Sequence, residues 1–229
     1  MKICLIGAGR IGAVHAIAIA SEESATLHSV VDLNHEAAEN LAKQYSADVL
    51  SIDEVFDNSE IDAFIIASST ATHADLIEKC AQVDKPVFCE KPIDLSLDRA
   101  LSCAQIVKES GIVCMLGFNR RFDPHMASFK NKVDANVIGS IQSLIITSHD
   151  PEPPSMDYIA GSGGLFHDMM IHDFDMACWI LNDTPSSIYV AAKAANDDIA
   201  NQGDVDTASV ILSMKGGAIV TIINGRQAS

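Results

Sequence analysis

The chain has 229 residues, 48% of them hydrophobic, and its 15 Lys and Arg against 31 Asp and Glu give a formal net charge of −16. At roughly 150 residues per domain, this length predicts one large domain or two smaller ones. A surface so acidic repels phosphate backbones and anionic lipid, which argues against a nucleic-acid or membrane-surface role. The composition also excludes a disordered chain.

The sequence contains no apolar stretch with the length of a membrane span. Gly7, Gly9 and Arg10 interrupt the first apolar run before it forms a signal-peptide core, so we expect a cytoplasmic protein. The cysteines lie in apolar segments without a CxxC pair, which predicts reduced, buried thiols rather than disulfides or zinc ligands. They are Cys4, Cys80, Cys89, Cys103, Cys114 and Cys178.

In the first half, short apolar runs alternate with helical patterns. The predicted strands are Lys2–Gly7, Thr26–Asp32, Asp62–Ala67, Pro86–Glu90 and Ile112–Gly117, and the predicted helices are Arg10–Ser21, His35–Tyr45, Thr72–Val83 and Ser96–Glu109. Strands that are apolar at nearly every position are buried on both faces, and the helices between them supply the cover. Residues 1–117 are therefore expected to form a doubly wound parallel sheet of Rossmann type, an α/β fold.

After Gly117 the pattern changes, and residues 118–229 are expected to form a second domain of α+β type with an antiparallel sheet. The predicted elements are helices at Asp123–Val133 and about Gly164 to Leu181, and strands at Ser140–His149, Ser187–Ala194, Thr207–Met214 and Ala218–Asn224. The chain stops just after a strand that belongs in a sheet. We therefore expect a fragment whose sheet is incomplete at the C-terminus.

Gly7-Ala8-Gly9-Arg10-Ile11-Gly12 is a GxGxxG motif that follows a predicted strand and opens a helix. In this context Gly7 allows a tight turn, Gly9 lets a pyrophosphate approach the backbone, and Gly12 lets helix and strand pack closely. The helix N-terminus offers free N–H groups to the anion. The motif predicts a dinucleotide site, against the alternative of a glycine turn that binds no dinucleotide.

Asp32 ends the second predicted strand, about twenty residues after the motif, where a carboxylate accepts hydrogen bonds from the adenosine ribose. An Asp there disfavours a 2′-phosphate, so NAD is favoured over NADP. Ser68, Thr70 and His73 follow another strand at the carboxyl edge of the sheet and are candidates for the cofactor. Thr70 or Thr72 is equally suited to cap the next helix.

Cys89-Glu90-Lys91-Pro92 follows a further strand, so Lys91 is expected at the same edge, beside the nicotinamide; a solvated turn lysine is the alternative. On one continuous helix, Asp168, His172 and Asp175 lie at i, i+4 and i+7 on one face. Oxidation of a secondary alcohol by NAD requires loss of its hydroxyl proton as hydride leaves the carbon. His172 is the candidate base, and Lys91 the group that holds the oxygen.

Two alternatives remain for that helix, a metal site and a buried structural network. A metal site would use His167, Asp168 and His172, but two histidines five residues apart do not share one face of an α-helix. We therefore expect no metal.

Four segments in this order carry a family resemblance: Gly7–Gly12, Lys85–Pro92, Gly117–Pro124 and Gly163–Asp175. They resemble the Gfo/Idh/MocA oxidoreductases, and the likeness extends from Met1 to the final residues. The resemblance implies a Rossmann domain followed by a domain with an open, largely antiparallel sheet, and NAD(H) dependence. It also implies oxidation of a ring hydroxyl of a cyclic polyol or sugar, with myo-inositol the expected substrate. A homo-oligomer, dimer or tetramer, is expected of the full-length form.

By motif, the resemblance makes Lys91, Asp168 and His172 the catalytic residues and adds Glu90 to the cofactor contacts. It places Asn119, Arg121 and Asp150 at the substrate, and it predicts a cis Lys91–Pro92 peptide bond. Three alternatives stay open: the same chemistry on another sugar, a non-catalytic protein that senses NAD(H), and an inactive fragment.

Overall fold

A computed structural model describes residues 1–228. The chain divides into two compact units, Met1–Gly117 and Phe118–Ser229, which we describe separately. Within the described residues, no helix combines the length and the apolarity needed to cross a bilayer.

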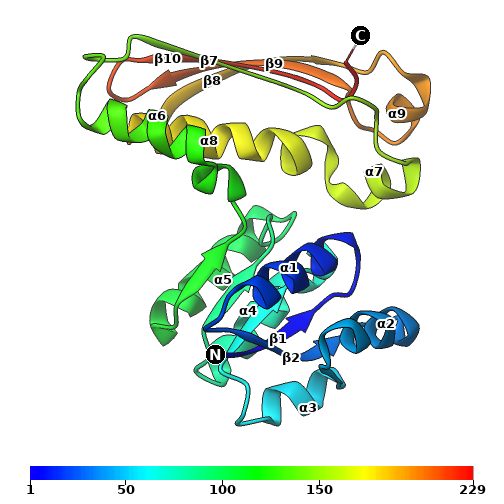
Figure 1. Cartoon of the computed structure of the whole chain (residues 1–229). Coiled ribbons are helices and arrows are strands. Elements are labelled where there is room, and N and C mark those ends of the chain that lie inside the picture. Colours follow the sequence, from blue (N-terminus) through cyan, green and yellow to red (C-terminus); the bar gives the residue numbers. More distant parts are fainter. Residues whose placement is uncertain (229) are drawn as a thin grey trace. The chain divides into compact units, whose positions relative to one another are not determined.

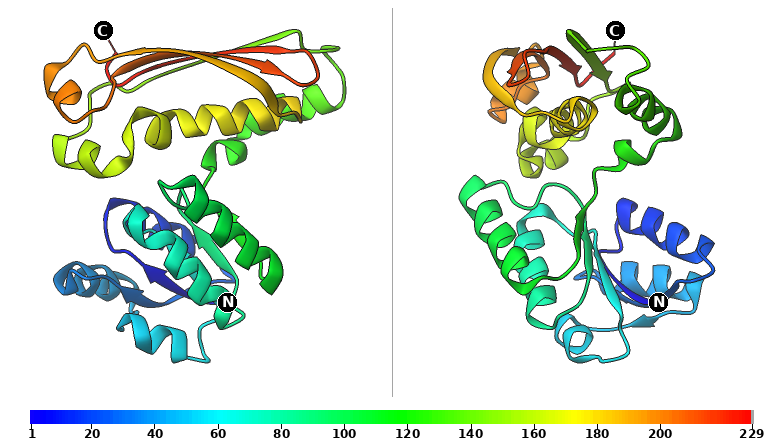
Figure 2. Two further views of the ribbon diagram at one scale, coloured as in Figure 1. Left: turned by 180° about the vertical axis from the view of Figure 1, so that it is seen from behind. Right: turned by 90° about the vertical axis from the view of Figure 1, so that its left-hand side faces the viewer.

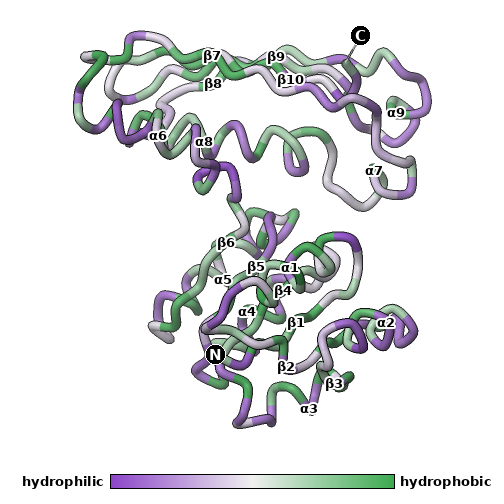
Figure 3. Tube along the Cα trace, viewed as in Figure 1, coloured by the Kyte–Doolittle hydropathy of each residue, from purple (hydrophilic) through white to green (hydrophobic). Residues whose placement is uncertain are grey.

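The first unit is built on a six-stranded sheet in the order β3-β2-β1-β4-β5-β6, and every pairing in it is parallel. The strands are β1 (Lys2–Ile6), β2 (Thr26–Val31), β3 (Asp48–Val49), β4 (Ala63–Ile66), β5 (Val87–Cys89) and β6 (Cys114–Leu116). Figure 3 colours much of β1, β4 and β5 as hydrophobic. The predicted Rossmann-type sheet is confirmed.

Helices cover both faces of this sheet (Figures 1 and 2). They are α1 (Arg10–Ser21), α2 (His35–Tyr45), α3 (Ile52–Asp57), α4 (His73–Gln82) and α5 (Leu97–Ser110). Alternate residues of β1 serve the two faces: Ile3 and Leu5 pack with α1 and α2, and Cys4 and Ile6 with α3, α4 and α5. Since both faces are covered, the strands must be apolar throughout.

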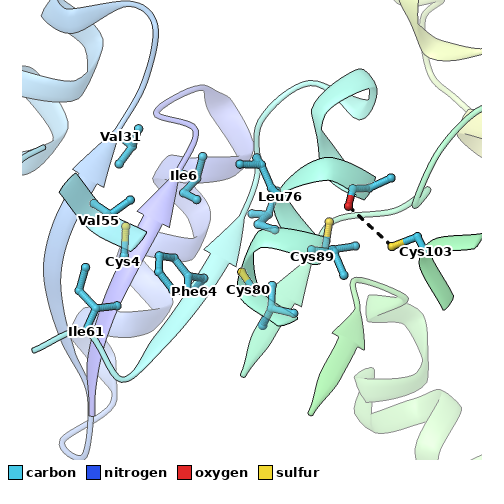
Figure 4. Close-up of a cluster of buried hydrophobic side chains, with 14 residues drawn as sticks. Cys4, Ile6, Val31, Val55, Ile61, Phe64, Leu76, Cys80, Cys89 and Cys103 are labelled. Carbon is cyan, nitrogen blue, oxygen red and sulfur yellow. Dashed lines mark hydrogen bonds between the residues drawn. The ribbon is translucent and has the colours of Figure 1, made fainter. Parts of the chain in front are cut away.

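The cysteines are free thiols, as predicted, and four of the six are buried. Cys80, Cys89 and Cys103 lie in the core under α4 and α5, where the Cys103 thiol donates to the Ala74 carbonyl (Figure 4). Burial raises the pKa of Cys4 to about 12 and that of Cys103 to about 11. These thiols therefore behave as small apolar side chains.

The second unit is built on a four-stranded sheet in the order β7-β10-β9-β8. The strands are β7 (Ser143–His149), β8 (Pro185–Lys193), β9 (Thr207–Met214) and β10 (Ile219–Gly225). The β10–β9 and β9–β8 pairs are antiparallel, and the β10–β7 pair is parallel. The expected largely antiparallel sheet is thus confirmed.

One face of this sheet packs on α8 (Ile171–Leu181) through a core that includes Val210, Leu212, Val220 and Ile222. The unit also contains α6 (Pro124–Asp134), α7 (Met156–Ser162) and α9 (Asp197–Asn201). In Figure 1, α6 and α8 lie on one side of the sheet, and no helix of the described residues covers the other side. The sheet is therefore open on that side.

The structure corrects the expected helix from Gly164 to Leu181. Phe166–Met170 forms a π-helical segment, and α8 begins only at Ile171. A π-turn bonds i to i+5 and so changes the angle between successive side chains. The bounds and the type of this helix therefore differ from the expectation, and Asp168 lies in the π-helical segment while His172 and Asp175 lie in α8.

Asp173 of α8 is a fully buried carboxylate that ties four segments of the second unit together. Its Oδ1 accepts from the Arg120 guanidinium and, at 2.9 Å, from the Ser148 hydroxyl. Its Oδ2 accepts from Asn224 Nδ2 at 2.7 Å. One cation and two neutral donors offset the cost of burying the Asp173 charge. Without Asp173, these donors would lose their acceptor.

Asp173→Ala is expected to destabilise the second unit by about 3 kcal/mol, because Arg120 loses its buried counter-charge and Asn224 its acceptor. Trp179, the single tryptophan, lies in α8, so urea unfolding followed by tryptophan emission reports on this unit. Glu152→Gln, at an exposed loop carboxylate, is the control and should leave the midpoint unchanged. Equal midpoints for the two variants would contradict the role given to Asp173.

Candidate functional site

The glycines of the first loop play different roles. Gly7 has φ +108°, and a Cβ on it would lie 2.5 Å from the Ala67 backbone. A Cβ on Gly12 would lie 1.9 Å from the Gly7 carbonyl oxygen. A Cβ on Gly9 would meet nothing within 4 Å, so the space above this residue is open. Gly7 and Gly12 shape the loop, and Gly9 leaves room for a ligand.

The start of α1 has the features of a pyrophosphate site. Gly9 is the N-cap of this helix, and it has no side chain that could accept from the first N–H groups. Arg10 is exposed there and Ile11 is half-buried. An uncapped helix N-terminus beside an open glycine fits an anion.

Asp32 follows β2 and lies against the same loop. Its Oδ2 accepts from the Ala8 N–H at 2.6 Å, and its Oδ1 accepts from the Asn34 N–H at 2.7 Å. These bonds fix the carboxylate while leaving it lone pairs, since a carboxylate accepts at about four sites. The carboxylate therefore keeps acceptor sites for the ribose contact that the sequence predicts.

The segment after β4 differs from the expectation. Thr72 is the N-cap of α4 but makes no cap bond; its hydroxyl bonds the Ser69 carbonyl at 2.8 Å and the Ser68 hydroxyl at 2.7 Å. Thr70 begins a short 3-10 helix rather than capping α4. Helix capping by either threonine is therefore wrong.

His73 needs the larger correction. Its side chain is 2% exposed, with Nδ1 2.7 Å from the Pro92 carbonyl and Nε2 3.1 Å from the Ser68 carbonyl. At least one ring nitrogen donates to a backbone carbonyl, and the buried ring offers almost no surface to a cofactor. His73 instead joins the loop after β4 to the loop that carries Lys91.

Glu90 and Lys91 follow β5, and the Lys91–Pro92 peptide is cis, as predicted. Glu90 Oε1 lies 2.9 Å from His15 Nε2 of α1. Burial raises the pKa of Glu90, but the bond and charge of His15 and those of Lys91 outweigh it, and the net shift is downward. A Cβ on Gly117 would lie 2.8 Å from Glu90 Oε2, so a larger residue there would displace the Glu90 carboxylate.

In the second unit, Asp168 lies in the π-helical segment and is held from two sides. Tyr158 Oη of α7 donates to its Oδ1 at 2.8 Å, and Arg226 Nη1 donates to its Oδ2 at 3.4 Å. π-helical turns are frequent at functional sites. The sequence predicted the aspartate but gave no sign of either partner.

His172 is the second residue of α8, half-buried, with its ring edge-on to Phe118 at 6.2 Å between centroids. Arg121 bonds Asp175 through two nitrogens, with Nε–Oδ2 at 2.8 Å, so Asp175 serves an ion pair. Asn119 is exposed in a short 3-10 helix.

Asp150 follows β7, where its N–H donates to the Gly225 carbonyl at 3.0 Å. Burial raises the pKa of its carboxyl, Asp168 raises it further, and the Arg226 and Arg120 charges oppose the rise. Asp150 therefore lies in the same electrostatic environment as Asp168. This grouping was expected only from the family resemblance.

A pocket of about 840 Å³ lies elsewhere in the second unit, lined by α6, β7 and α8 residues such as Phe129, Ile146 and Met176. Asp150, Asp168 and His172 are not among its lining residues. Three of its polar side chains, Arg120, Ser148 and Asp173, already bond one another. It is therefore separate from the candidate catalytic residues. Across residues 1–228 no group of three or more His, Cys, Asp or Glu is arranged to hold a metal.

Comparison with known proteins settles the family. Residues 1–118 match the oxidoreductase family with an NAD-binding Rossmann fold, and residues 126–229 match the GFO/IDH/MocA C-terminal domain. The chain belongs to the Gfo/Idh/MocA oxidoreductase family. It is accordingly an NAD-dependent oxidoreductase, as the sequence predicted.

Similar members of the family are known. The chain is 45% identical to an inositol 2-dehydrogenase of Rhizobium meliloti, over 100% of this chain and 70% of that protein. It is 38% identical to a myo-inositol 2-dehydrogenase of Thermotoga maritima, over 100% of this chain and 69% of that one. A crystal structure of a putative myo-inositol dehydrogenase from Sinorhizobium meliloti superposes with a TM-score of 0.97 at 44% identity, covering 100% of this chain and 70% of that chain.

The loop glycines give a test of the cofactor site. Gly9→Ala should leave the fold intact, since its Cβ meets no atom, but should weaken NADH binding about tenfold by filling the anion's approach. Gly12→Ala should lower the unfolding temperature, because its Cβ collides with the Gly7 carbonyl. Calorimetric titration and far-UV circular dichroism measure the two effects. Unchanged NADH affinity in Gly9→Ala would place the pyrophosphate elsewhere.

Proposed function

We propose that this protein catalyses NAD-dependent oxidation of a secondary ring hydroxyl of myo-inositol or a similar cyclic polyol. The observation that carries the substrate class is the 45% identity, along the whole chain, to a protein named inositol 2-dehydrogenase. A relative 36% identical over 95% of this chain is named scyllo-inositol 2-dehydrogenase (NAD(+)). The relatives thus agree on an inositol ring and differ in the isomer.

The cofactor half of the proposal rests on residues of the first unit. The open space at Gly9 and the uncapped start of α1 take the pyrophosphate, and Asp32 takes the adenosine ribose. Asp32 disfavours a 2′-phosphate, which favours NAD. Ser68, Thr70 and Glu90 are assigned to the remaining cofactor contacts. NAD held there would supply the acceptor for the hydride that leaves the carbinol carbon.

At the substrate, each side chain is assigned one role. His172 takes the hydroxyl proton as the C–H bond breaks, so the alcohol becomes a ketone and the proton passes to the imidazole. Lys91 donates to the same oxygen and stabilises its developing negative charge. Asp168 is assigned to orient the imidazole and stabilise its cation. Asn119, Arg121 and Asp150 are assigned to the other hydroxyls of the ring.

The state of Asp168 supports this assignment. A carboxylate that stabilises an imidazolium must stay fixed, and both Asp168 oxygens accept hydrogen bonds, from Tyr158 and from Arg226. Asp168 also lies in a π-helical turn directly before the helix that bears His172, and such turns are frequent at functional sites.

NADH absorbance with a panel of sugars tests the substrate class. We expect NAD reduction with myo-inositol or scyllo-inositol and little with glucose, because the relatives share the inositol ring. The control is the same panel with NADP, which should react more slowly because of Asp32. Tight NADH binding without turnover on any polyol would favour a sensor of NAD(H) and overturn the enzymatic proposal.

His172→Ala should lower kcat by a factor of about 10² to 10⁴, the usual contribution of a general base, and leave the Kd for NADH nearly unchanged. His125→Ala, at an exposed histidine of α6, is the matched control and should leave both constants unaltered. Steady-state kinetics and NADH titration separate the two effects. If His172→Ala turns over at the parent rate, another residue is the base.

A further inference from the structure

We propose that Arg226, held in place by Asp204, is a positioning residue for Asp168. It is the buried cation that fixes the catalytic carboxylate from the end of β10. This inference rests on the proposed function, because it takes the role of Asp168 from there.

Arg226 follows β10 and its side chain has no exposed surface. Its backbone N–H donates to the Asp206 carbonyl at 2.8 Å, which anchors the residue at the end of the sheet. One guanidinium nitrogen, Nη1, lies 3.4 Å from Asp168 Oδ2, and the other, Nη2, lies 3.0 Å from Asp204 Oδ2. A single buried cation thus serves two carboxylates. Having no exposed surface, it acts through Asp168.

Asp204 explains why the guanidinium stays in place. Its Oδ1 accepts from the Leu165 N–H at 2.9 Å, directly before the π-helical segment. Gly164, with φ +82°, makes room for this bond, since a Cβ there would lie 2.7 Å from Asp204 Oδ1. One carboxylate therefore fastens both the start of the segment that carries Asp168 and the arginine that bonds Asp168.

Two donors from separate elements restrict how Asp168 turns. Tyr158 of α7 bonds Oδ1, and Arg226 after β10 bonds Oδ2, so rotation of the carboxylate breaks at least one bond. The two donors are not equivalent, because the Tyr158 side chain is 47% exposed and Arg226 is fully buried. The Tyr158 bond is the shorter, at 2.8 Å, and Arg226, at 3.4 Å, adds the buried positive charge that restrains Oδ2. Loss of this restraint slows the chemical step without touching the cofactor site, which is built from the first unit.

Arg226→Lys keeps the charge but loses the forked geometry that spans Asp168 and Asp204. We expect kcat on the polyol to fall about tenfold, with the Kd for NADH unchanged and a larger primary deuterium isotope effect from substrate labelled at the oxidised carbon. The matched control is Arg99→Lys, because Arg99 also lies between two carboxylates, Asp75 and Glu78. It should leave kcat unaltered.

Asp204→Asn is the second variant. Its amide oxygen still accepts from Leu165, but its NH2 group faces the guanidinium and displaces it, so the same fall in kcat is expected. Parent-like kcat and isotope effects in both variants would overturn the inference. So would loss of the folded Trp179 emission in both, which would assign the network to folding alone. Asp168→Asn separates the hypotheses: if it retains full turnover, the proposed role of Asp168 fails first.

Discussion

The second unit depends on burying carboxylates in a chain that is short of cations. With 31 acidic and 15 basic side chains, most carboxylates must face water or bond backbone N–H groups. Arginines of this unit nevertheless pair with carboxylates that are buried or half-buried: Arg120 with Asp173, Arg121 with Asp175, and Arg226 with Asp168 and Asp204. Replacing buried ion pairs by apolar residues is often neutral or stabilising, so their presence is weak evidence for stability. Their value lies in holding named oxygens at fixed positions.

The acidic composition also constrains the cofactor site. In the proposed cofactor site, the backbone N–H groups at the start of α1 supply the positive potential for a pyrophosphate. That proposal rests on the uncapped start of α1, on the open space at Gly9 and on the packing that only glycine allows at Gly12. In the same proposal Asp32 is a fixed acceptor for neutral hydroxyls, for which its negative charge is an advantage.

Features that local pattern determines could be predicted from the sequence. The helices Arg10–Ser21 and His35–Tyr45 and the strand Thr207–Met214 have the predicted bounds, because burial fixes their apolar periods. The missed helix α3 did carry a signal, a capping box in which Ser51 and Glu54 bond each other's backbone N–H groups. Ser155 likewise caps the missed helix α7, although a Pro-rich stretch precedes it. Both are short, and short helices leave little periodicity to read.

What could not be predicted depends on partners far away in the chain. Arg120 and Asp173 are 53 residues apart, and Arg226 and Asp168 are 58 apart, so no spacing rule pairs them. The π-turn at Phe166–Met170 departs from the 3.6-residue period that was assumed for one continuous helix. His73 was predicted to contact the cofactor because it is a polar residue at the ligand-binding edge of the sheet. In the structure its ring is buried between two backbone carbonyls. A ligand site needs suitable residue types at the carboxyl edge of the sheet. Whether such a side chain contacts a ligand or bonds the neighbouring loops depends on its burial.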